Sequence, residues 1–171
     1  SRGLGDVYKR QQKMLVKVAR EENKKFTVFT LGRICYQKNP KLFNEVAKKL
    51  PDVRFVWIGD GELREELTAD NIEITGWVNR RKALSYAVSA DAFVLTSLWE
   101  GLPMSLLEAM YMEKLCVVSN VIGNRDVIKN AKNGFVCNSA DEFAEKIKYI
   151  ESNDCSVMVG NAKKDVMERY N

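Results

Sequence analysis

The chain has 171 residues, the usual size of one domain, and 46% of them are apolar, so it can bury a normal core and is not a disordered chain. The net charge of +4 is mild, and the basic residues are spread over predicted helix faces instead of clustering with aromatic residues, which argues against nucleic-acid binding. No run reaches the roughly 18 apolar residues of a membrane span, so we expect a cytoplasmic protein with at most peripheral contact to the inner face of the plasma membrane.

The sequence contains no His, which excludes catalysis by Ser-His-Asp or Cys-His arrangements and most catalytic zinc sites. Four Cys occur, and no two have the spacing of a CxxC pair. Cys116 and Cys137 lie in apolar, strand-like runs, so we expect both to be buried, reduced thiols.

The two ends of the chain have patterns that differ from the rest. Residues 1–11 (SRGLGDVYKRQ) resemble a translated sequencing linker, which predicts that the protein continues upstream; a native flexible arm is the alternative. We expect residues 12–25 to form a connecting helix and residues 26–171 to form the folded domain, whose last residues follow a helical pattern.

Apolar runs and amphipathic helices alternate from residue 26 onward. The predicted strands are rich in β-branched or aromatic residues and cover 26–31, 53–58, 72–75, 92–96, 115–119 and 135–136. Helices are expected at 40–50, 62–68, 80–89 and 103–112, and a final amphipathic helix begins at a cap formed by Asp141.

This alternation predicts an α/β fold, a single Rossmann-like three-layer α/β/α domain with a parallel sheet of about six strands. In such folds, ligands bind beyond the carboxyl ends of the strands. The segments expected at that edge are 32–39, 59–62, 76–80, 97–104 and 120–125.

The segment after the strand at 92–96 has the features of an anion site. Pro103 suits the first turn of a helix, where its missing N–H costs nothing. The backbone amides of Met104 and Ser105 would then be unpaired donors at the positive end of the helix. Gly101 allows the backbone to approach a ligand closely.

Two glutamates accompany this helix start. At about 100° per residue, Glu108 lies on the side of Met104 and Ser105, where its carboxylate could accept hydrogen bonds from vicinal hydroxyls of a sugar. A structural role is the alternative: Glu100 would only complement the helix dipole, worth roughly 0.3–1 kcal/mol, and Glu108 would be solvated.

The loop after the first strand carries Gly32, Arg33 and Lys38. Arg33 offers a fork for phosphate oxygens, and Lys38 offers a mobile point charge. Two basic residues on one loop are usually only solvated. Together with the start of a helix on the same edge of the sheet, however, Arg33 and Lys38 predict a diphosphate-binding site.

In order and spacing, residues 26–150 resemble the retaining nucleotide-sugar transferases of glycosyltransferase family four, also called the group 1 glycosyltransferases. The family's motifs match at Gly32, Arg33 and Lys38, at Gly59–Leu63, at Gly76–Val78, at Glu100 and Glu108, and at Asn133–Phe135. The resemblance implies the C-terminal, donor-binding half of a two-Rossmann-domain (GT-B) enzyme. The N-terminal acceptor domain would be missing, so we expect no turnover from this chain alone.

The resemblance also implies residue roles. Arg33 and Lys38 would stabilise the leaving nucleoside diphosphate, and Glu100 would contact hydroxyls of the transferred sugar. Glu108 would contact the ribose, and Val78 would border the base. The phosphates and the sugar would be held by the backbone of Gly101, Leu102, Pro103, Met104 and Ser105.

The implied reaction is transfer of a hexose-type sugar from a UDP- or GDP-linked donor, with retention, in bacterial cell-surface polysaccharide synthesis. The resemblance implies no metal and no cofactor, since basic side chains would replace the metal, and no DxD pair follows an apolar strand. Asp60, between two glycines, is predicted to be a turn residue. A nucleotide-sugar epimerase and a non-catalytic nucleotide-sugar-binding module are the alternatives. A dinucleotide-dependent oxidoreductase is disfavoured because no G-x-G-x-x-G follows the first strand.

Overall fold

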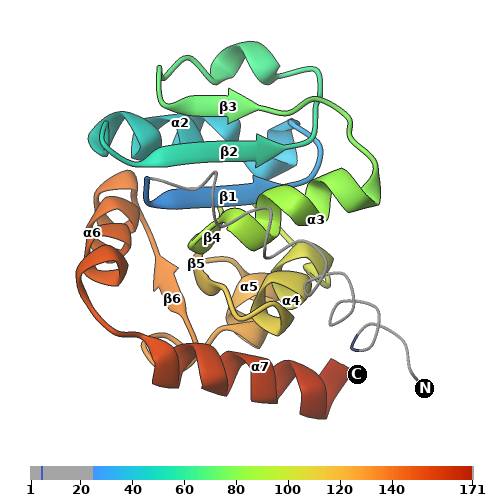
Figure 1. The fold of residues 1–171 in the computed structure, drawn as a ribbon, viewed down its shortest axis with the longest axis vertical. Helices are drawn as coiled ribbons and strands as arrows, with labels where there is room; N and C mark the ends of the chain where they lie inside the picture. Colours follow the sequence, from blue (N-terminus) through green and yellow to red (C-terminus); the bar gives the residue numbers. More distant parts are fainter. Residues whose placement is uncertain (1–4, 6–24, 171) are drawn as a thin grey trace.

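The computed structural model describes Gly5 and residues 25–170, and apart from Gly5 and Lys25 the predictions for 1–11 and 12–25 fall outside the described residues. One parallel sheet runs through the described part of the chain (Figure 1). Its strands are β1 (Thr27–Leu31), β2 (Arg54–Ile58), β3 (Ile72–Ile74), β4 (Ala92–Leu95), β5 (Leu115–Ser119) and β6 (Phe135–Cys137). The helices are α2 (Pro40–Lys49), α3 (Arg80–Ser89), α4 (Met104–Tyr111), α5 (Ile122–Val127), α6 (Ala140–Ser152) and α7 (Ser156–Tyr170).

The strand order is β3-β2-β1-β4-β5-β6, and each neighbouring pair is parallel. From β1 the chain runs outward through β2 to β3 and then returns to the other side of β1 at β4. The order of strands therefore reverses between β1 and β4. At such a reversal the loops leave the sheet in opposite directions and open a crevice at the carboxyl ends of the two strands. The predicted six-stranded parallel α/β fold is confirmed.

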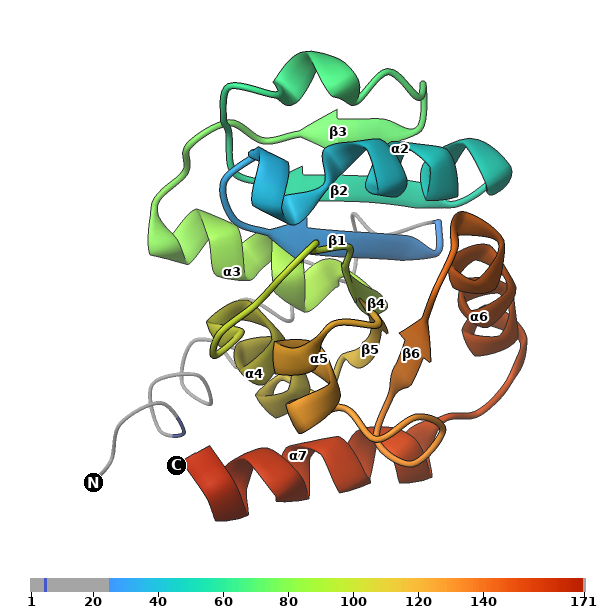
Figure 2. The same ribbon diagram turned by 180° about the vertical axis from the view of Figure 1, so that it is seen from behind.

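Two apolar cores cover the two faces of the sheet. Residues alternate along each central strand: in β2, Phe55 and Trp57 join one core and Val56 and Ile58 join the other. This period of two follows from the pleat of a strand. One core is closed by α2 and α6, and the other by α3, α4 and α7. Figures 1 and 2 show α2 and α3 on opposite faces, which gives the three predicted layers.

Several local predictions were wrong. Residues 62–68 form only a short 3-10 helix, Arg64–Glu66. The carboxamide oxygen of Asn44 accepts from the amides of Thr68 and Ala69, which takes the chain out of helical geometry. The cap of α6 is Ser139, whose hydroxyl accepts from the Glu142 amide, so Asp141 lies within the first turn.

The other differences concern α7, α5 and α4. α7 follows α6, so the helix at Asp141 is not the last one. α5 was not predicted, because its six residues include Gly123, Asn124 and Asp126, which are weak helix formers. α4 begins at Met104, one residue later than predicted, so Pro103 is the cap residue of the helix and not its first residue.

Cys116 and Cys137 are buried in the cores and carry no disulfide, as the apolar runs around them predicted. Within the described ranges, no helix has both the length and the apolar character needed to cross a membrane.

Candidate functional site

Two loops meet at the reversal point between β1 and β4. The Thr96 hydroxyl donates to the Lys38 carbonyl at 2.8 Å, and the Leu98 amide donates to the Gln37 carbonyl at 2.8 Å. The Gln37 side chain also donates to the carbonyl of Trp99 at 2.9 Å. These bonds hold the loop after β1 against the loop after β4, so side chains from both project into one region.

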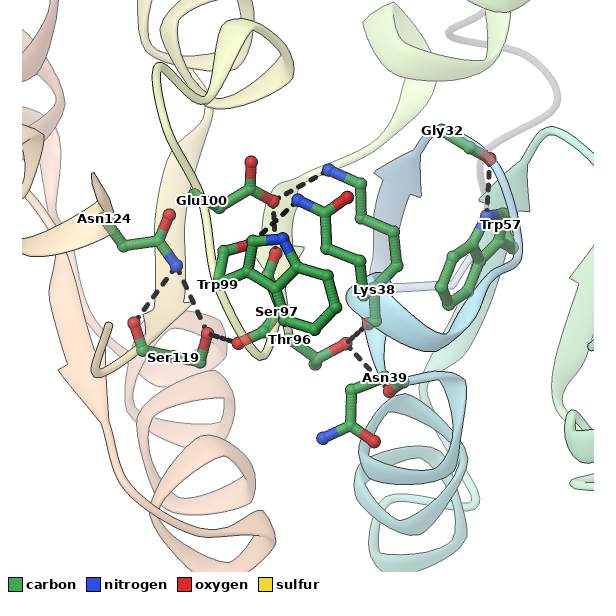
Figure 3. A network of polar contacts seen from close by, with 11 residues as sticks. Gly32, Lys38, Asn39, Trp57, Thr96, Ser97, Trp99, Glu100, Ser119 and Asn124 are labelled. Carbon is green, nitrogen blue, oxygen red and sulfur yellow. Dashed lines mark hydrogen bonds and ion pairs between the residues drawn. The ribbon is translucent and has the colours of Figure 1, made fainter. Parts of the chain in front are cut away.

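Lys38 and Glu100 form an ion pair in this region, with 2.8 Å between Nζ and Oε2. The Ser97 hydroxyl donates to the same oxygen at 2.5 Å (Figure 3). The Glu100 side chain is only 6% exposed and that of Lys38 19%, so solvent screens the pair weakly. Among the described residues, none hydrogen-bonds the other carboxylate oxygen, Oε1, which leaves an oriented acceptor.

Gly32 places the backbone beside Lys38. A Cβ at Gly32 would lie 3.6 Å from Lys38 Cε, and the residue has a φ of 144°, which other residues rarely adopt. The Trp57 indole N–H donates to the Gly32 carbonyl at 2.9 Å and fixes the turn (Figure 3). Gly59 packs so closely under this carbonyl that any Cβ there would overlap it.

Arg33 does not join the Lys38–Glu100 pair. Its Nε lies 2.9 Å from Glu62 Oε1, and its side chain is 64% exposed. The hydrogen bond from Arg33 holds the pKa of the Glu62 carboxyl below its usual value. Arg33 is thus a cation on the same rim of the sheet, held by an exposed and weak ion pair that a ligand could replace.

The start of α4 lies next in the chain after Glu100. The amides of Leu106 and Leu107 donate to the Pro103 carbonyl, so Met104 and Ser105 supply the first amides of the helix, and no described residue accepts a hydrogen bond from either. A Cβ at Gly101 would meet open space. Leu102 and Met104 are exposed, so the segment is accessible to a ligand.

Ser105 and Glu108 line a cavity of about 220 Å³ between α3 and α4. Arg80 also lines it, and the remaining wall is mainly apolar. Val78 does not line this cavity; it is partly buried and packs against the core closed by α3, α4 and α7. The structure thus brings two of the predicted donor-binding residues together and leaves Val78 to one side.

Some residues that build the site were not predicted individually. Gln37 joins the loop after β1 to the loop after β4, which we call the Glu100 loop, and Ser97 bonds Glu100 within that loop. Ser119 at the end of β5 and Gly123 of α5 contact the Glu100 loop directly, and Asn124 of α5 bonds Ser119. Gly123 lies against the carbonyls of Glu100 and Gly101, with no room for a Cβ. Their signal in the sequence is position: Gln37, Ser97, Gly123 and Asn124 fall in the segments 32–39, 97–104 and 120–125 that were expected at the ligand edge, and Ser119 is the last residue of β5.

The described residues contain no group of three or more His, Cys, Asp or Glu side chains placed to hold a metal ion. Asp60 accepts from the Gly61 amide and from Arg64, at 2.8 Å and 2.9 Å, so its carboxylate makes local bonds in the loop after β2. Metal independence stays a prediction.

The model of the glycosyl transferases group 1 family matches residues 11–165. Among curated proteins, the chain is 35% identical over 163 residues to the Escherichia coli UDP-Gal:alpha-D-GlcNAc-diphosphoundecaprenol alpha-1,3-galactosyltransferase, an alignment that covers 84% of this chain and 42% of that enzyme.

Two solved structures share the fold. The C-terminal domain of the Francisella tularensis glycosyl transferase group 1 protein LpcC matches with a TM-score of 0.76 and 22% identity, covering 90% of this chain and 92% of that domain. Anabaena Alr3699/HepE, in complex with UDP and glucose, matches with a TM-score of 0.78 and 18% identity, covering 95% of this chain and 48% of HepE. The chain therefore belongs to the glycosyl transferases group 1 family, and its fold is that of the C-terminal domain of a GT-B glycosyltransferase.

Proposed function

We propose that this chain binds a nucleoside diphosphate sugar and forms the donor-binding part of a retaining, metal-independent hexosyltransferase. The observation that carries the proposal is the buried Lys38–Glu100 pair, held by Ser97 at the reversal point of the sheet beside the start of α4. A cation, an oriented carboxylate and unpaired helix amides at one place match a ligand with a diphosphate and sugar hydroxyls.

Three groups would receive the diphosphate. Lys38 has three N–H donors and gives one to Glu100, so two are left for phosphate oxygens. Arg33 would exchange Glu62 for the phosphate, and the first amides of α4, at Met104 and Ser105, would complete the charge stabilisation. Lys38 is already neutralised by the buried Glu100, so the net positive charge would come from Arg33 once the exposed Glu62 has turned away to solvent. These groups would also stabilise the diphosphate as it leaves.

The two glutamates would recognise hydroxyls. Glu100 Oε2 is occupied by Lys38 and Ser97, so Oε1 would accept hydrogen bonds from the transferred sugar. Glu108, at the cavity shared with Ser105, would accept from the ribose, and the base would lie toward Val78.

In the proposed reaction the bond between the anomeric carbon and the diphosphate oxygen breaks, and a bond from the acceptor hydroxyl oxygen forms on the same face of the sugar. The acceptor proton passes to the departing phosphate, so no side-chain nucleophile is needed. No metal or cofactor is assigned to the site, since Arg33, Lys38 and the helix amides would stabilise the charge.

The acceptor would be held by the rest of a longer protein, because the chain spans only 42% of the E. coli relative. That relative acts on a sugar linked to diphosphoundecaprenol. We therefore propose a role in cell-surface glycan synthesis, at the cytoplasmic side of the membrane, with UDP as the first nucleotide to test.

Isothermal titration calorimetry of the chain with UDP, GDP and their sugars tests the proposal, with EDTA and with Mg²⁺. We expect binding of equal strength in both conditions; binding that requires Mg²⁺ would contradict metal independence. Lys38→Ala should weaken UDP binding by about 10-fold or more, because a charged hydrogen bond contributes about 1.5–3 kcal/mol. Lys41→Ala, at an exposed position on α2, is the matched control and should leave the affinity unchanged.

A further inference from the structure

A chain of hydrogen bonds runs from α5 to the Glu100 carboxylate (Figure 3). The Asn124 side-chain amide donates to the carbonyl and the hydroxyl of Ser119, at 3.1 Å and 3.2 Å. The Ser119 hydroxyl donates to the Ser97 carbonyl at 2.6 Å. The Ser97 hydroxyl then donates to Glu100 Oε2 at 2.5 Å. We call these three residues, Asn124, Ser119 and Ser97, the relay.

The relay is buried and directional. Asn124 is fully buried, and Ser119 and Ser97 are 7% and 2% exposed. The Ser119 hydroxyl accepts from Asn124 and donates to Ser97, so its single proton has only one orientation that satisfies both bonds. A buried and satisfied chain of this kind holds its members in one arrangement. The orientation of Ser97, and with it that of Glu100, is therefore linked to α5.

The Asn124 side chain uses its two polar groups unequally. Its Oδ1 is buried, and no described residue donates a hydrogen bond to it. Both hydrogen bonds of the Asn124 side chain therefore come from its amide nitrogen, and both go to Ser119. The contribution of Asn124 to the relay is thus its side-chain N–H donors, which bind Ser119.

The backbone of α5 supports the same loop. Gly123, next to Asn124, packs directly on the Glu100 and Gly101 carbonyls, where its missing side chain allows contact. The relay and this contact fix the Glu100 loop against β5 and α5, and Lys38, from the loop after β1, binds the carboxylate itself.

We propose that Ser119 and Asn124 are positioning residues that fix the orientation of Glu100 toward the sugar of the bound donor, and so set the discrimination among sugars. The proposal rests on the proposed function, in which Glu100 Oε1 accepts from the sugar. Neither residue touches the ligand in this scheme. Without the relay, Ser97 is no longer fixed, and the Glu100 carboxylate can rotate about its ion pair with Lys38. The site would then bind donor sugars that differ in the configuration of a hydroxyl with similar affinity.

The test measures the dissociation constants of UDP and of a panel of epimeric UDP-hexoses for the wild-type chain, Ser119→Ala and Asn124→Ala. Ser119→Ala removes a single oxygen, so it remains informative if Asn124→Ala fails to fold. We expect the ratio of affinities between the best and the worst hexose to fall about 5-fold, the loss of one neutral hydrogen bond, while the affinity for UDP stays within about 2-fold. Asn120→Ala is the matched control, because Asn120 bonds Asn138 and Arg125 and takes no part in the relay.

Each outcome decides between the two proposals. If the folded variants keep the wild-type ratio, or lose affinity for UDP and all hexoses equally, the positioning role is wrong and the residues are only structural. If the wild-type chain binds UDP but does not discriminate among hexoses, the sugar contact of Glu100 and the relay both fail. If the wild-type chain binds neither UDP nor UDP-hexoses, the proposed function itself is wrong.

Discussion

Lys38 and Glu100 lie 62 residues apart in the sequence, and their charged atoms meet at 2.8 Å with the carboxylate almost completely buried. The pair joins the loop after β1 to the loop after β4, the two neighbouring strands at which the strand order reverses. It therefore links the stability of the sheet edge to the chemistry proposed there.

Removing one partner of this pair should cost more stability than removing both charges. Lys38→Met leaves the Glu100 carboxylate buried without its cation, and we expect a loss of about 3 kcal/mol in the free energy of unfolding. The double variant Lys38→Met/Glu100→Gln should recover part of that loss, because no charge is left buried. Urea unfolding of the single and double variants measures the coupling; strictly additive effects would show that the pair is not coupled in the folded chain.

Arg33 should matter for the ligand and not for the fold. Its ion pair with Glu62 is exposed, so Arg33→Ala should change the free energy of unfolding by less than about 0.5 kcal/mol. Affinity for UDP should fall much more than affinity for uridine, because only the phosphates lose a partner. Glu62→Gln releases Arg33 and should strengthen UDP binding. Calorimetry with both ligands checks this, and equal losses for UDP and uridine in Arg33→Ala would refute the assignment.

Glu108 should select ribose. Glu108→Ala should weaken UDP binding by about 10-fold and remove any preference for UDP over 2′-deoxy-UDP, since the carboxylate would accept from the ribose hydroxyls. Glu151→Ala, an exposed glutamate on α6, serves as the control. A variant that still prefers the ribose form would place the ribose elsewhere.

Two glycines at the site should respond differently to Ala. Gly123→Ala inserts a methyl group against the Glu100 and Gly101 carbonyls and should destabilise the fold by about 1–3 kcal/mol. Gly101→Ala meets only open space, so its stability should be close to wild type, whereas its nucleotide affinity should fall if a ligand occupies that space. Thermal unfolding and calorimetry separate the two effects. Normal nucleotide binding by Gly101→Ala would mean that the ligand does not approach this backbone.

Stability should change with pH through Lys114. Its ammonium group donates to the Val88 and Ala90 carbonyls, and burial lowers its pKa from 10.5 to about 8. Between these values the unfolded chain binds more protons than the folded one, so the free energy of unfolding should rise with pH above about 8. Burial raises the thiol pKa of Cys116 and Cys137, which has the opposite effect above pH 9, where unfolded thiols ionise.

Lys114 alone should contribute a rise of about 1 kcal/mol from pH 8 to 9. The two thiols offset more than half of it, because unfolded thiols begin to ionise in this range, so we expect a small net rise followed by a decline above pH 9. Urea unfolding under reducing conditions measures it. In Lys114→Met the rise should be absent, and a variant profile that matches the wild type would show that Lys114 is not responsible.

The sequence by itself determined the layers of the fold and the edge of the sheet, at the carboxyl ends of the strands, where a ligand is expected. The continuous apolar run of β2 requires a buried face on each side, because successive side chains of a strand point to opposite faces, and this period depends only on local geometry. Gly32 and Lys38 could likewise be assigned to a loop after a strand. The boundaries of α3 and β5 agree with the prediction because both segments have strong local signals at their ends.

Only the tertiary structure decided which charges meet. Lys38 could have paired with any acid on the rim, and the neighbouring positions of β1 and β4 select Glu100, while Arg33 is left with Glu62. α5 depends on tertiary contacts in the same way, since Gly123 and Asn124 are stabilised by the Glu100 loop and Ser119 instead of by helix propensity. Side-chain pairing across distant segments depends on strand order, and strand order results from the packing of the whole sheet, which no local pattern encodes.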